Sequence, residues 1–318
     1  MSKTICSERT FRLSVAVCLA APALTLGLSA AAQTPATALE ESRLEPVIVQ
    51  GSRLGQTTAE IGSSVSVLTA ADLETLGVDF AVDALVSVSG VTVNTNGAFG
   101  GTASVRIRGA GSEQTLVLID GIPVNDPTTP GGGFDFARLD VADIEQIEVL
   151  KGPQSTLWGT DAIGGVVSIV TKAPETGAGG QAFAEIGSFN TVRGGASAEG
   201  ANDTGDFRIA VVGTSTDGIS KADEDNGNDE ADGYEATTLS ANGGLNLPRE
   251  ARLQADVRWT ESETEFDVFS FGAEGSVADG DQSNETEELT ANLSLRAPLF
   301  GGRLENLLLV GYADISRQ

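Results

Sequence analysis

Alternation of apolar and polar side chains is the feature that most limits what this chain can fold into. Three runs in the second half repeat with a period of two: TTLSANGGLNL (237–247), RLQADVRWT (252–260) and ELTANLSLRA (288–297). In each run, leucine, alanine, valine or tryptophan alternates with polar or charged residues. Because successive side chains of a β-strand point to opposite faces, these runs predict strands with one apolar and one polar surface.

The connections between these strands differ in length. Residues 202–206, 248–250 and 301–302 make short turns, whereas 217–234 and 267–284 are long, acidic and contain glycine. Strands with an apolar face, short turns at one end and long loops at the other are typical of an outer-membrane β-barrel. A soluble antiparallel sandwich is the alternative fold.

The strand count predicts an incomplete barrel. We expect about seven strands in residues 176–318, out of the roughly 22 that large outer-membrane barrels contain. An open sheet edge cannot face lipid, because its backbone groups would lack hydrogen-bond partners. The expectation is therefore an antiparallel transmembrane β-barrel of which residues 176–318 are the truncated N-terminal part, in a chain that is the front of a longer protein.

The first 32 residues have the pattern of a secretory signal peptide. Lys3, Arg9 and Arg12 precede an apolar run that ends in small residues, which is the order of charge, core and cleavage site in such signals. A single membrane anchor is the alternative, but Pro22 interrupts the run and no basic stop follows it. We expect export, with residues 1–32 removed.

Composition excludes several kinds of function. The chain has no histidine, and both cysteines lie inside the predicted signal. Ser-His-Asp triads, histidine zinc sites and catalytic cysteines are therefore excluded from the mature chain. A net charge of −26 excludes nucleic acid as a partner, since phosphate binding needs a basic surface. We predict that the protein is not an enzyme, with a secreted carboxylate-dependent hydrolase as the alternative.

The first half has a different pattern. Residues 33–52 are mostly polar and small and predict a flexible N-terminus, except for the apolar stretch EPVIVQG (45–51). From about residue 60 to 172, short helical and strand patterns alternate, and glycine closes most of them. We expect an α+β domain over residues 53–175.

The end of this domain carries a specific resemblance. The stretch IEQIEVLKGPQSTLWGTDAIGGVVSIVTK (144–172) resembles the closing segment of the plug domain in TonB-dependent outer-membrane receptors. The preceding VRIRGAGSEQTLVLIDGIPVND (105–126) resembles the same family's IRG and VLIDG segments, and EPVIVQGSRL (45–54) is similar to its TonB box. Within the family, the cobalamin receptors are the most similar. Pro46 and Gln50 stand where the family prefers threonine.

The resemblance implies roles for particular residues. The TonB box would add as a strand to TonB, and the arginines of the IRG segment would contact the barrel wall. The outer plug loops, 94–101 and 125–135, would contact the substrate. The TonB-binding residues are Glu45, Pro46, Val47, Ile48 and Val49; the plug–barrel contacts are Arg106 and Arg108; the substrate-binding residues are Asn94, Asn96, Gly97, Asn125, Asp126 and Phe134.

The resemblance also implies a cargo and a location. We expect energy-coupled uptake of cobalamin, or of a ferric siderophore, across the outer membrane of a Gram-negative bacterium, with TonB and membrane lipids as partners and no covalent cofactor. The acidic segment 217–235 is either a solvated loop or a loop ordered by calcium. If the cobalamin-receptor pattern applies, the calcium ligands are Glu230, Asp232, Asp267 and Asp279.

Overall fold

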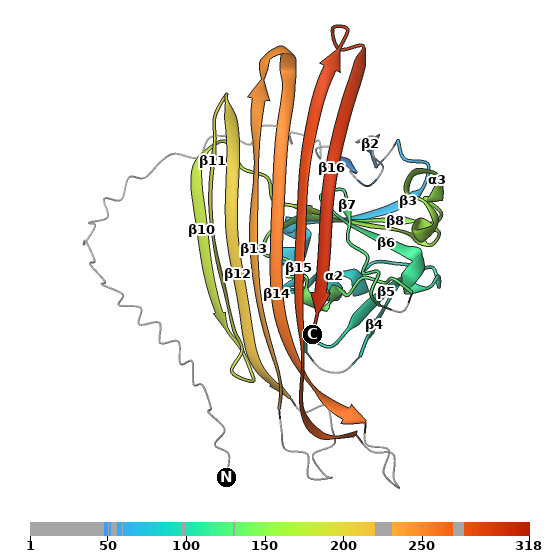
Figure 1. The fold of residues 1–318 in the computed structure, drawn as a ribbon, viewed down its shortest axis with the longest axis vertical. Coiled ribbons are helices and arrows are strands. Elements are labelled where there is room, and N and C mark those ends of the chain that lie inside the picture. The colour runs from blue at the N-terminus through green and yellow to red at the C-terminus, as the bar shows by residue number, and fades with distance from the viewer. Residues whose placement is uncertain are drawn as a thin grey trace, which may run out of the picture. The chain divides into compact units, whose positions relative to one another are not determined.

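The computed structural model (Figure 1) shows a long sheet with a smaller α/β module on one side of it. It describes residues 48–49, 51, 56–58, 60–96, 99–129, 131–219, 231–269 and 277–318, with side chains at all of these except 48, 267–269 and 277–281. Both parts belong to one compact unit, residues 45–318. No helix in the described part of the chain is long and apolar enough to cross a membrane.

The sheet consists of seven antiparallel strands in sequence order. The strands are β10 (Gly177–Ile186), β11 (Val192–Ala201), β12 (Gly205–Ile219), β13 (Asp232–Leu247), β14 (Ala251–Phe269), β15 (Val277–Leu299) and β16 (Leu304–Arg317). Sequence-adjacent strands pair throughout, as in an up-and-down barrel wall. The short turn Pro248–Glu250 is a 3₁₀ segment.

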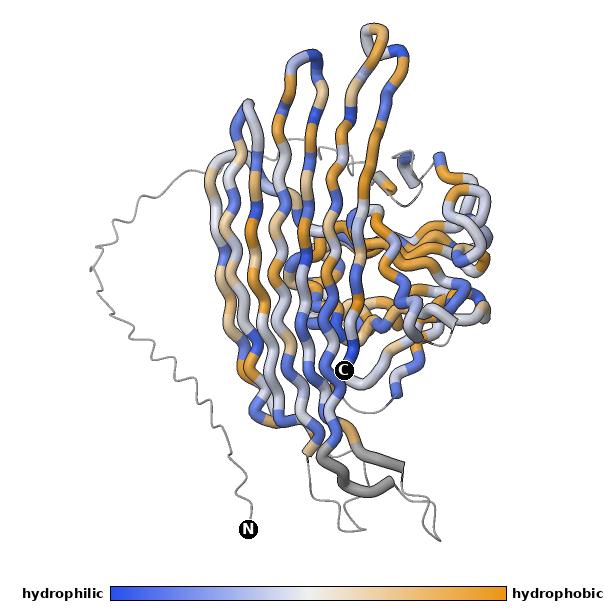
Figure 2. The backbone as a smooth tube through the Cα atoms, viewed as in Figure 1, coloured by the Kyte–Doolittle hydropathy of each residue, from blue (hydrophilic) through white to orange (hydrophobic). Residues whose placement is uncertain are grey.

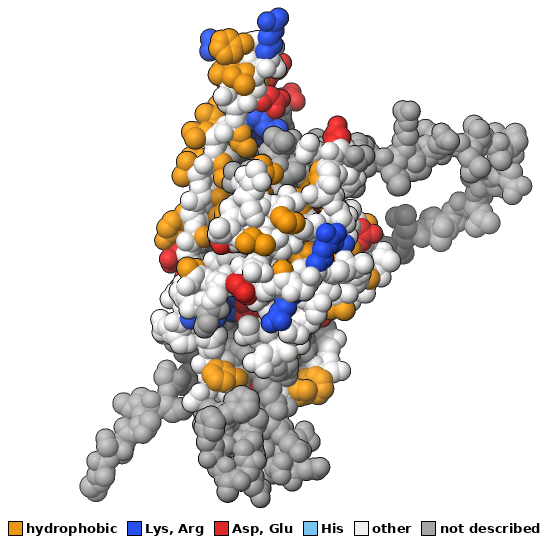
Figure 3. Space-filling model, turned by 90° about the vertical axis from the view of Figure 1, so that its right-hand side faces the viewer, with side chains coloured by type: hydrophobic (Ala, Val, Ile, Leu, Met, Phe, Trp, Pro, Cys, Tyr) orange, Lys and Arg blue, Asp and Glu red, His pale blue; other side chains and the backbone are white. Residues whose placement is uncertain are grey.

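The alternation predicted for these strands is confirmed, and the polar face is the one that is buried. Ser240, Asp256 and Asn292 are each 9% exposed, whereas Leu239 and Val257, on the opposite face, are 45% and 46% exposed. Figure 2 shows hydrophilic and hydrophobic residues alternating along the strands. In Figure 3, apolar side chains run up the strands, and the edge strand β16 exposes a row of them. An apolar outer face is what a barrel wall presents to lipid.

Two strands are longer than the sequence pattern predicts. We expected a loop over 267–284, but β14 continues to Phe269 and β15 begins at Val277. Polar residues occur on both faces of SETEFDVF (262–269), so the sequence shows no apolar face there. The hydrogen bonds between strands join backbone groups and do not require an apolar face. Pairing therefore continues beyond the apolar band.

The smaller part, which we call the N-terminal module (residues 48–171), contains a five-stranded sheet in the order β3-β8-β9-β6-β7. Only β6 and β9 pair in parallel. The strands are β3 (Ser64–Thr69), β8 (Ile144–Lys151), β9 (Gly165–Thr171), β6 (Thr115–Ile119) and β7 (Ile122–Pro123); two hairpins add β1 (Ile48–Val49) with β2 (Gln56–Thr57) and β4 (Val91–Thr95) with β5 (Ala103–Ile107). The helices are α1 (Ala70–Leu76), α2 (Ala81–Val86) and α3 (Ser155–Trp158), with 3₁₀ turns at Ser112–Gln114, Phe136–Arg138 and Thr160–Ala162.

Local sequence explains where helix α1 begins and ends. Thr69 caps the N-terminus in a capping box, in which the Asp72 carboxylate accepts hydrogen bonds from the Thr69 amide at 2.8 Å and its hydroxyl at 2.7 Å. Such boxes satisfy amides that a helix start leaves without partners. Gly77 ends the helix in the left-handed conformation, with φ 64°, which glycine adopts without strain.

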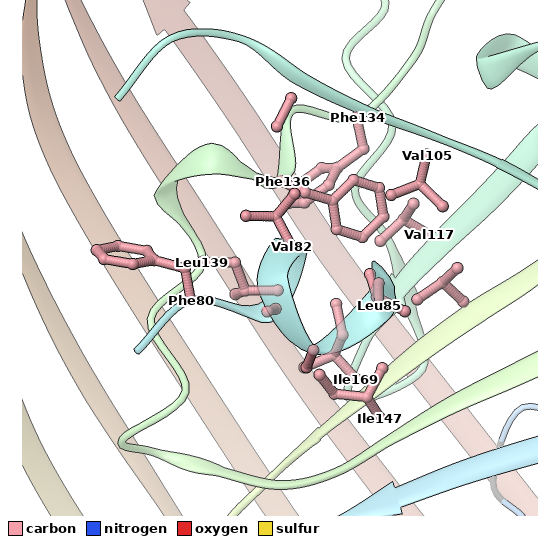
Figure 4. Close-up of a cluster of buried hydrophobic side chains, with 14 of the residues drawn as sticks. Phe80, Val82, Leu85, Val105, Val117, Phe134, Phe136, Leu139, Ile147 and Ile169 are labelled. Carbon is pink, nitrogen blue, oxygen red and sulfur yellow. The ribbon is translucent and has the colours of Figure 1, made fainter. Parts of the chain in front are cut away.

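The main core of the module lies between helix α2 and the strands (Figure 4). The rings of Phe134 and Phe136 meet edge to face at 4.9 Å, a favourable aromatic geometry. The core residues drawn and labelled in Figure 4 are Phe80, Val82, Leu85, Val105, Val117, Phe134, Phe136, Leu139, Ile147 and Ile169.

The glycines of the closing segment allow a turn against packed backbone. Gly165 has φ 155°, and a Cβ atom there would lie 2.3 Å from the carbonyl oxygen of Leu150. At Gly164, a Cβ atom would lie 2.6 Å from that of Ala110. Any larger residue would therefore push β9 away from its neighbours.

Candidate functional site

The surface between the module and the sheet carries most of the buried charge, and two arginines of the sheet form its centre. On β11, Arg193 donates to both carboxylate oxygens of Asp140, each at 2.7 Å. Its remaining amino group pairs with Glu185 at 2.7 Å and with Asp79 at 3.1 Å. Bidentate arginine–carboxylate pairs are among the strongest polar contacts in proteins.

On the neighbouring strand β12, Arg208 contacts a second carboxylate of the module, Asp143, three residues after Asp140. It pairs with Asp143 at 3.1 Å and with Glu199, on β11, at 2.7 Å. The Ser240 hydroxyl on β13 donates to the second oxygen of Asp143. The segment from Asp140 to Asp143, just before β8, is thus held by three strands of the sheet.

A second group of ion pairs is centred on Arg138 of the module. Arg138 donates to Asp135 at 3.1 Å and also pairs with Glu288 of β15. Asp135 in turn accepts a hydrogen bond from the Ala103 amide at 2.8 Å. Burial by itself would lower the pKa of Arg138, but the carboxylates of Glu288 and Asp135 outweigh it and raise that pKa, so the guanidinium stays charged.

Aromatic rings join loop 94–101 to the sheet. Phe99 meets Phe80 at 5.1 Å and Tyr234 of β13 at 5.3 Å, both edge to face. Gly100 lies so close to the Tyr234 ring that a Cβ atom there would come within 2.3 Å of it. Its carbonyl oxygen also accepts a hydrogen bond from Thr264 of β14 at 3.3 Å. Phe99 and Gly100 therefore pack directly against the sheet.

The N-terminal strand is docked on the module. Val49 is fully buried in a second apolar cluster, which includes Leu118 and Leu150. The Gly51 amide donates to Glu148 at 2.8 Å, and the Trp158 indole donates to the Gly51 carbonyl at 2.9 Å. The short strand β1 also pairs with β2.

Comparison with known proteins identifies the module. Residues 57–166 match the sequence profile of the TonB-dependent Receptor Plug Domain. The module is the plug of a TonB-dependent receptor. The seven-stranded sheet corresponds to part of the barrel wall, so the predicted fold class is confirmed. The match is with receptors and not with enzymes, which removes the hydrolase alternative.

Individual relatives extend the match beyond the plug. The chain is 35% identical over 231 residues to the vitamin B12 transporter BtuB of Vibrio vulnificus, a match that covers 70% of this chain and 36% of that protein. It is 41% identical over 133 residues to the iron-regulated outer membrane virulence protein of Vibrio cholerae, covering 40% and 20% of the two chains. The chain thus spans little more than a third of these relatives at most.

Solved structures show the same fold. The pyoverdine outer membrane receptor FpvA of Pseudomonas aeruginosa superposes with a TM-score of 0.68 and 18% identity, over 83% of this chain and 39% of that one. The siderophore receptor PiuA of Acinetobacter baumannii gives 0.62 and 19%, over 82% and 38%. At such identities the likeness concerns the fold alone.

The structure places the predicted substrate-binding residues in two settings. Asn94 and Asn96 are exposed at the end of hairpin β4–β5, and Gly97 lies outside the described residues. By contrast, Asp126 and Phe134 are buried. The side-chain amide of Asn125 accepts a hydrogen bond from the Val117 amide and donates to the Thr115 and Gly132 carbonyls. The last three therefore shape their loop, and contact with a substrate remains a prediction for all six residues.

The predicted TonB-binding segment is only partly described. Glu45, Pro46 and Val47 lie outside the described residues, whereas Ile48 and Val49 form β1. The sequence predicted a strand that adds to TonB, and Val49 of this strand is fully buried in the structure. Binding to TonB stays a prediction, with the added requirement that this strand first leaves its place on the plug.

Contact of Arg106 and Arg108 with a barrel wall stays a prediction, and other arginines join the plug to the sheet among the described residues. Arg106 and Arg108 are exposed, and neither forms an ion pair in the described part of the chain. Ion pairs between acidic residues and other arginines join the plug and the sheet. These arginines are Arg138, Arg193, Arg208 and Arg317. A signal existed for Arg193 and Arg208, since each alternates with small or apolar residues on a strand and so lies on its polar face.

The predicted calcium ligands cannot be brought together from the described residues. Asp232 is buried at the start of β13. Glu230 lies outside the described residues, and so do the side chains of Asp267 and Asp279. Within the described ranges, no group of three acidic, histidine or cysteine side chains is arranged to hold a metal ion. Calcium binding in these loops therefore stays a prediction.

Proposed function

We propose that this chain is part of an outer-membrane receptor that imports cobalamin with energy supplied through TonB. The observation that carries the proposal is the match to vitamin B12 transporters, because it spans 231 residues and so includes sheet as well as plug. The apolar outer face of the strands supports a position in a lipid bilayer. Export under a signal peptide supports the outer membrane.

The contacts of strand β1 with the plug are weak enough for TonB to release this strand while the core of the plug stays folded. TonB would pair with residues 45–49 by strand addition. Each backbone hydrogen bond gained contributes about 1 kcal/mol, and removing the Val49 side chain from its pocket costs roughly 1.5–3 kcal/mol. A few bonds therefore offset the release of β1, but not the loss of the main core around Phe136.

A ferric siderophore is the second candidate cargo, and specific observations favour it. The iron-regulated virulence protein is 41% identical over 133 residues of the chain. Of the two structural neighbours reported above, one is bound to pyoverdine and the other is a siderophore receptor, although they share the fold at low identity. The plug is therefore compatible with either cargo.

Growth tests separate the candidates. The receptor is expressed in a Gram-negative strain that needs cobalamin and lacks its own cobalamin and siderophore receptors, with and without TonB. We expect TonB-dependent growth at limiting cobalamin. Ile48→Pro removes the amide needed for strand addition and should abolish growth, whereas Ile48→Val should preserve it. Growth only on ferric siderophores would favour the second cargo, and growth independent of TonB would refute energy-coupled import.

A further inference from the structure

A small, partly open space lies where the plug meets the sheet. Its volume is about 10 Å³, and it sits between the turn after β6 and the facing sides of β13, β14 and β15. This is about the room that one water molecule or one atomic ion needs. Its polar lining includes Asp120 and Thr171 from the plug and Asn242, Asp256, Arg258 and Asn292 from the sheet.

Two amide oxygens in the lining have no hydrogen-bond partner among the described residues. Asn292 donates through Nδ2 to the Asp120 carbonyl at 3.2 Å, and Asn242 donates through Nδ2 to the Lys172 carbonyl at 2.9 Å. Since both partners are acceptors, these bonds fix which end of each amide carries the oxygen. Both Oδ1 atoms are buried and accept no hydrogen bond from the protein. Such atoms are rare in native proteins and mark a missing donor or ion.

The charged residues that line this space do not balance one another. Asp120 and Asp256 bring two negative charges and Arg258 brings one positive charge, which leaves one negative charge. The Asp120 carboxylate accepts from the Thr171 amide at 2.9 Å and its hydroxyl at 3.0 Å. Even so, burial above all, together with the neighbouring Asp256, raises its pKa to about 6. The charged form of Asp120 is therefore incompletely compensated.

We propose that this space binds one monovalent cation of sodium size, coordinated by oxygens of the plug and the sheet. A single positive charge balances the lining, whereas a divalent ion would leave one positive charge buried. A water molecule would supply donors to the two amide oxygens but no charge. The bound ion would tie the turn at Asp120 to β14 and β15. This site is independent of the cargo and of the TonB-binding segment.

Thermal unfolding of the intact receptor in detergent tests the proposal. Midpoints are compared in NaCl, KCl and choline chloride at equal ionic strength. Because an ion that binds only the folded state stabilises it, we expect a midpoint about 2–4 °C higher in NaCl than in choline chloride, with a smaller gain in KCl. Equal midpoints in the three salts would overturn the proposal and leave a water molecule as the occupant.

Variants connect the salt effect to this space. Asn292→Leu removes one of the two free oxygens and should abolish the difference between NaCl and choline chloride. Asn284→Leu is the matched control, since Asn284 lies on the same face of β15 but outside the lining, and it should keep the difference. Asn292→Asp adds a ligand charge and should enlarge it, which gives a second result if the leucine variant does not fold. An unchanged salt effect in both Asn292 variants would place the ion elsewhere.

Discussion

Replacing Arg193 by methionine tests how strongly the sheet holds the plug. The change keeps much of the side-chain volume but removes both hydrogen bonds to Asp140 and the contacts with Glu185 and Asp79. The Arg193 and Asp140 side chains are 7% and 9% exposed, so water cannot readily replace the lost partner. Three carboxylates then lie close together without a cation.

The size of the effect follows from this burial. Removing one partner of a buried ion pair destabilises a protein by about 3–5 kcal/mol. We expect the lower end, about 3 kcal/mol, because Asp140 keeps the hydrogen bond from the Ala142 amide at 2.7 Å. Asp140→Asn should have a smaller effect, about 1.5 kcal/mol, since Arg193 still has Glu185 and Asp79 as partners.

Hydrogen–deuterium exchange of the peptide 139–146 measures this attachment locally. A loss of about 3 kcal/mol corresponds to exchange roughly 100-fold faster. Arg252→Met is the matched control, because Arg252 pairs with Asp206 inside the sheet and is 36% exposed; exchange of the same peptide should not change. If Arg193→Met speeds exchange less than about tenfold, the pair is not what anchors the plug.

Three further outcomes are expected. Tyr234→Phe should leave the unfolding midpoint unchanged or raise it slightly, because the buried hydroxyl has no hydrogen-bond partner among the described residues. If the free energy of unfolding measured by chemical denaturation falls by more than about 2 kcal/mol, the hydroxyl is hydrogen-bonded. Gly51→Val should free the N-terminal strand, since a Cβ atom there already lies 3.0 Å from Leu150, and faster amide exchange at Val49 with unchanged exchange in β8 would show it. The hydrogen bonds from Thr69 lower the pKa of Asp72. The Asp72 carboxylate therefore contributes to stability above the ordinary aspartate pKa of about 4, and this contribution is lost as the pH falls through the lowered pKa. Asp72→Asn should remove this acid dependence of stability, and an identical dependence in both proteins would contradict the capping role.

The strands of the sheet could be predicted because their constraint is local. Alternation in 252–260 and 288–297 identified both strands and the two faces, and β14 and β15 pair over these stretches. Strand ends were less predictable. The polar residues of Ser262–Phe269 show no apolar face, and only the neighbouring strand makes them part of the ladder.

The contacts of the plug could not be predicted from periodicity. Arg193 and Asp140 are far apart in sequence, and nothing local indicates that they meet. The family resemblance pointed to Arg106 and Arg108, which are exposed in the described structure. Likewise, the apolar residues of EPVIVQG predict a strand, but whether Val49 is free or buried depends on its fit between Leu118 and Leu150, which is a matter of tertiary packing.

The plug strands and the sheet strands belong to separate hydrogen-bonded ladders. In the described part of the chain, each hydrogen bond that joins the two involves at least one side chain. Single codon changes can therefore strengthen or weaken the connection while both backbones keep their registers. Natural selection can therefore adjust the strength of the contact between plug and sheet one residue at a time, without changing the fold of either.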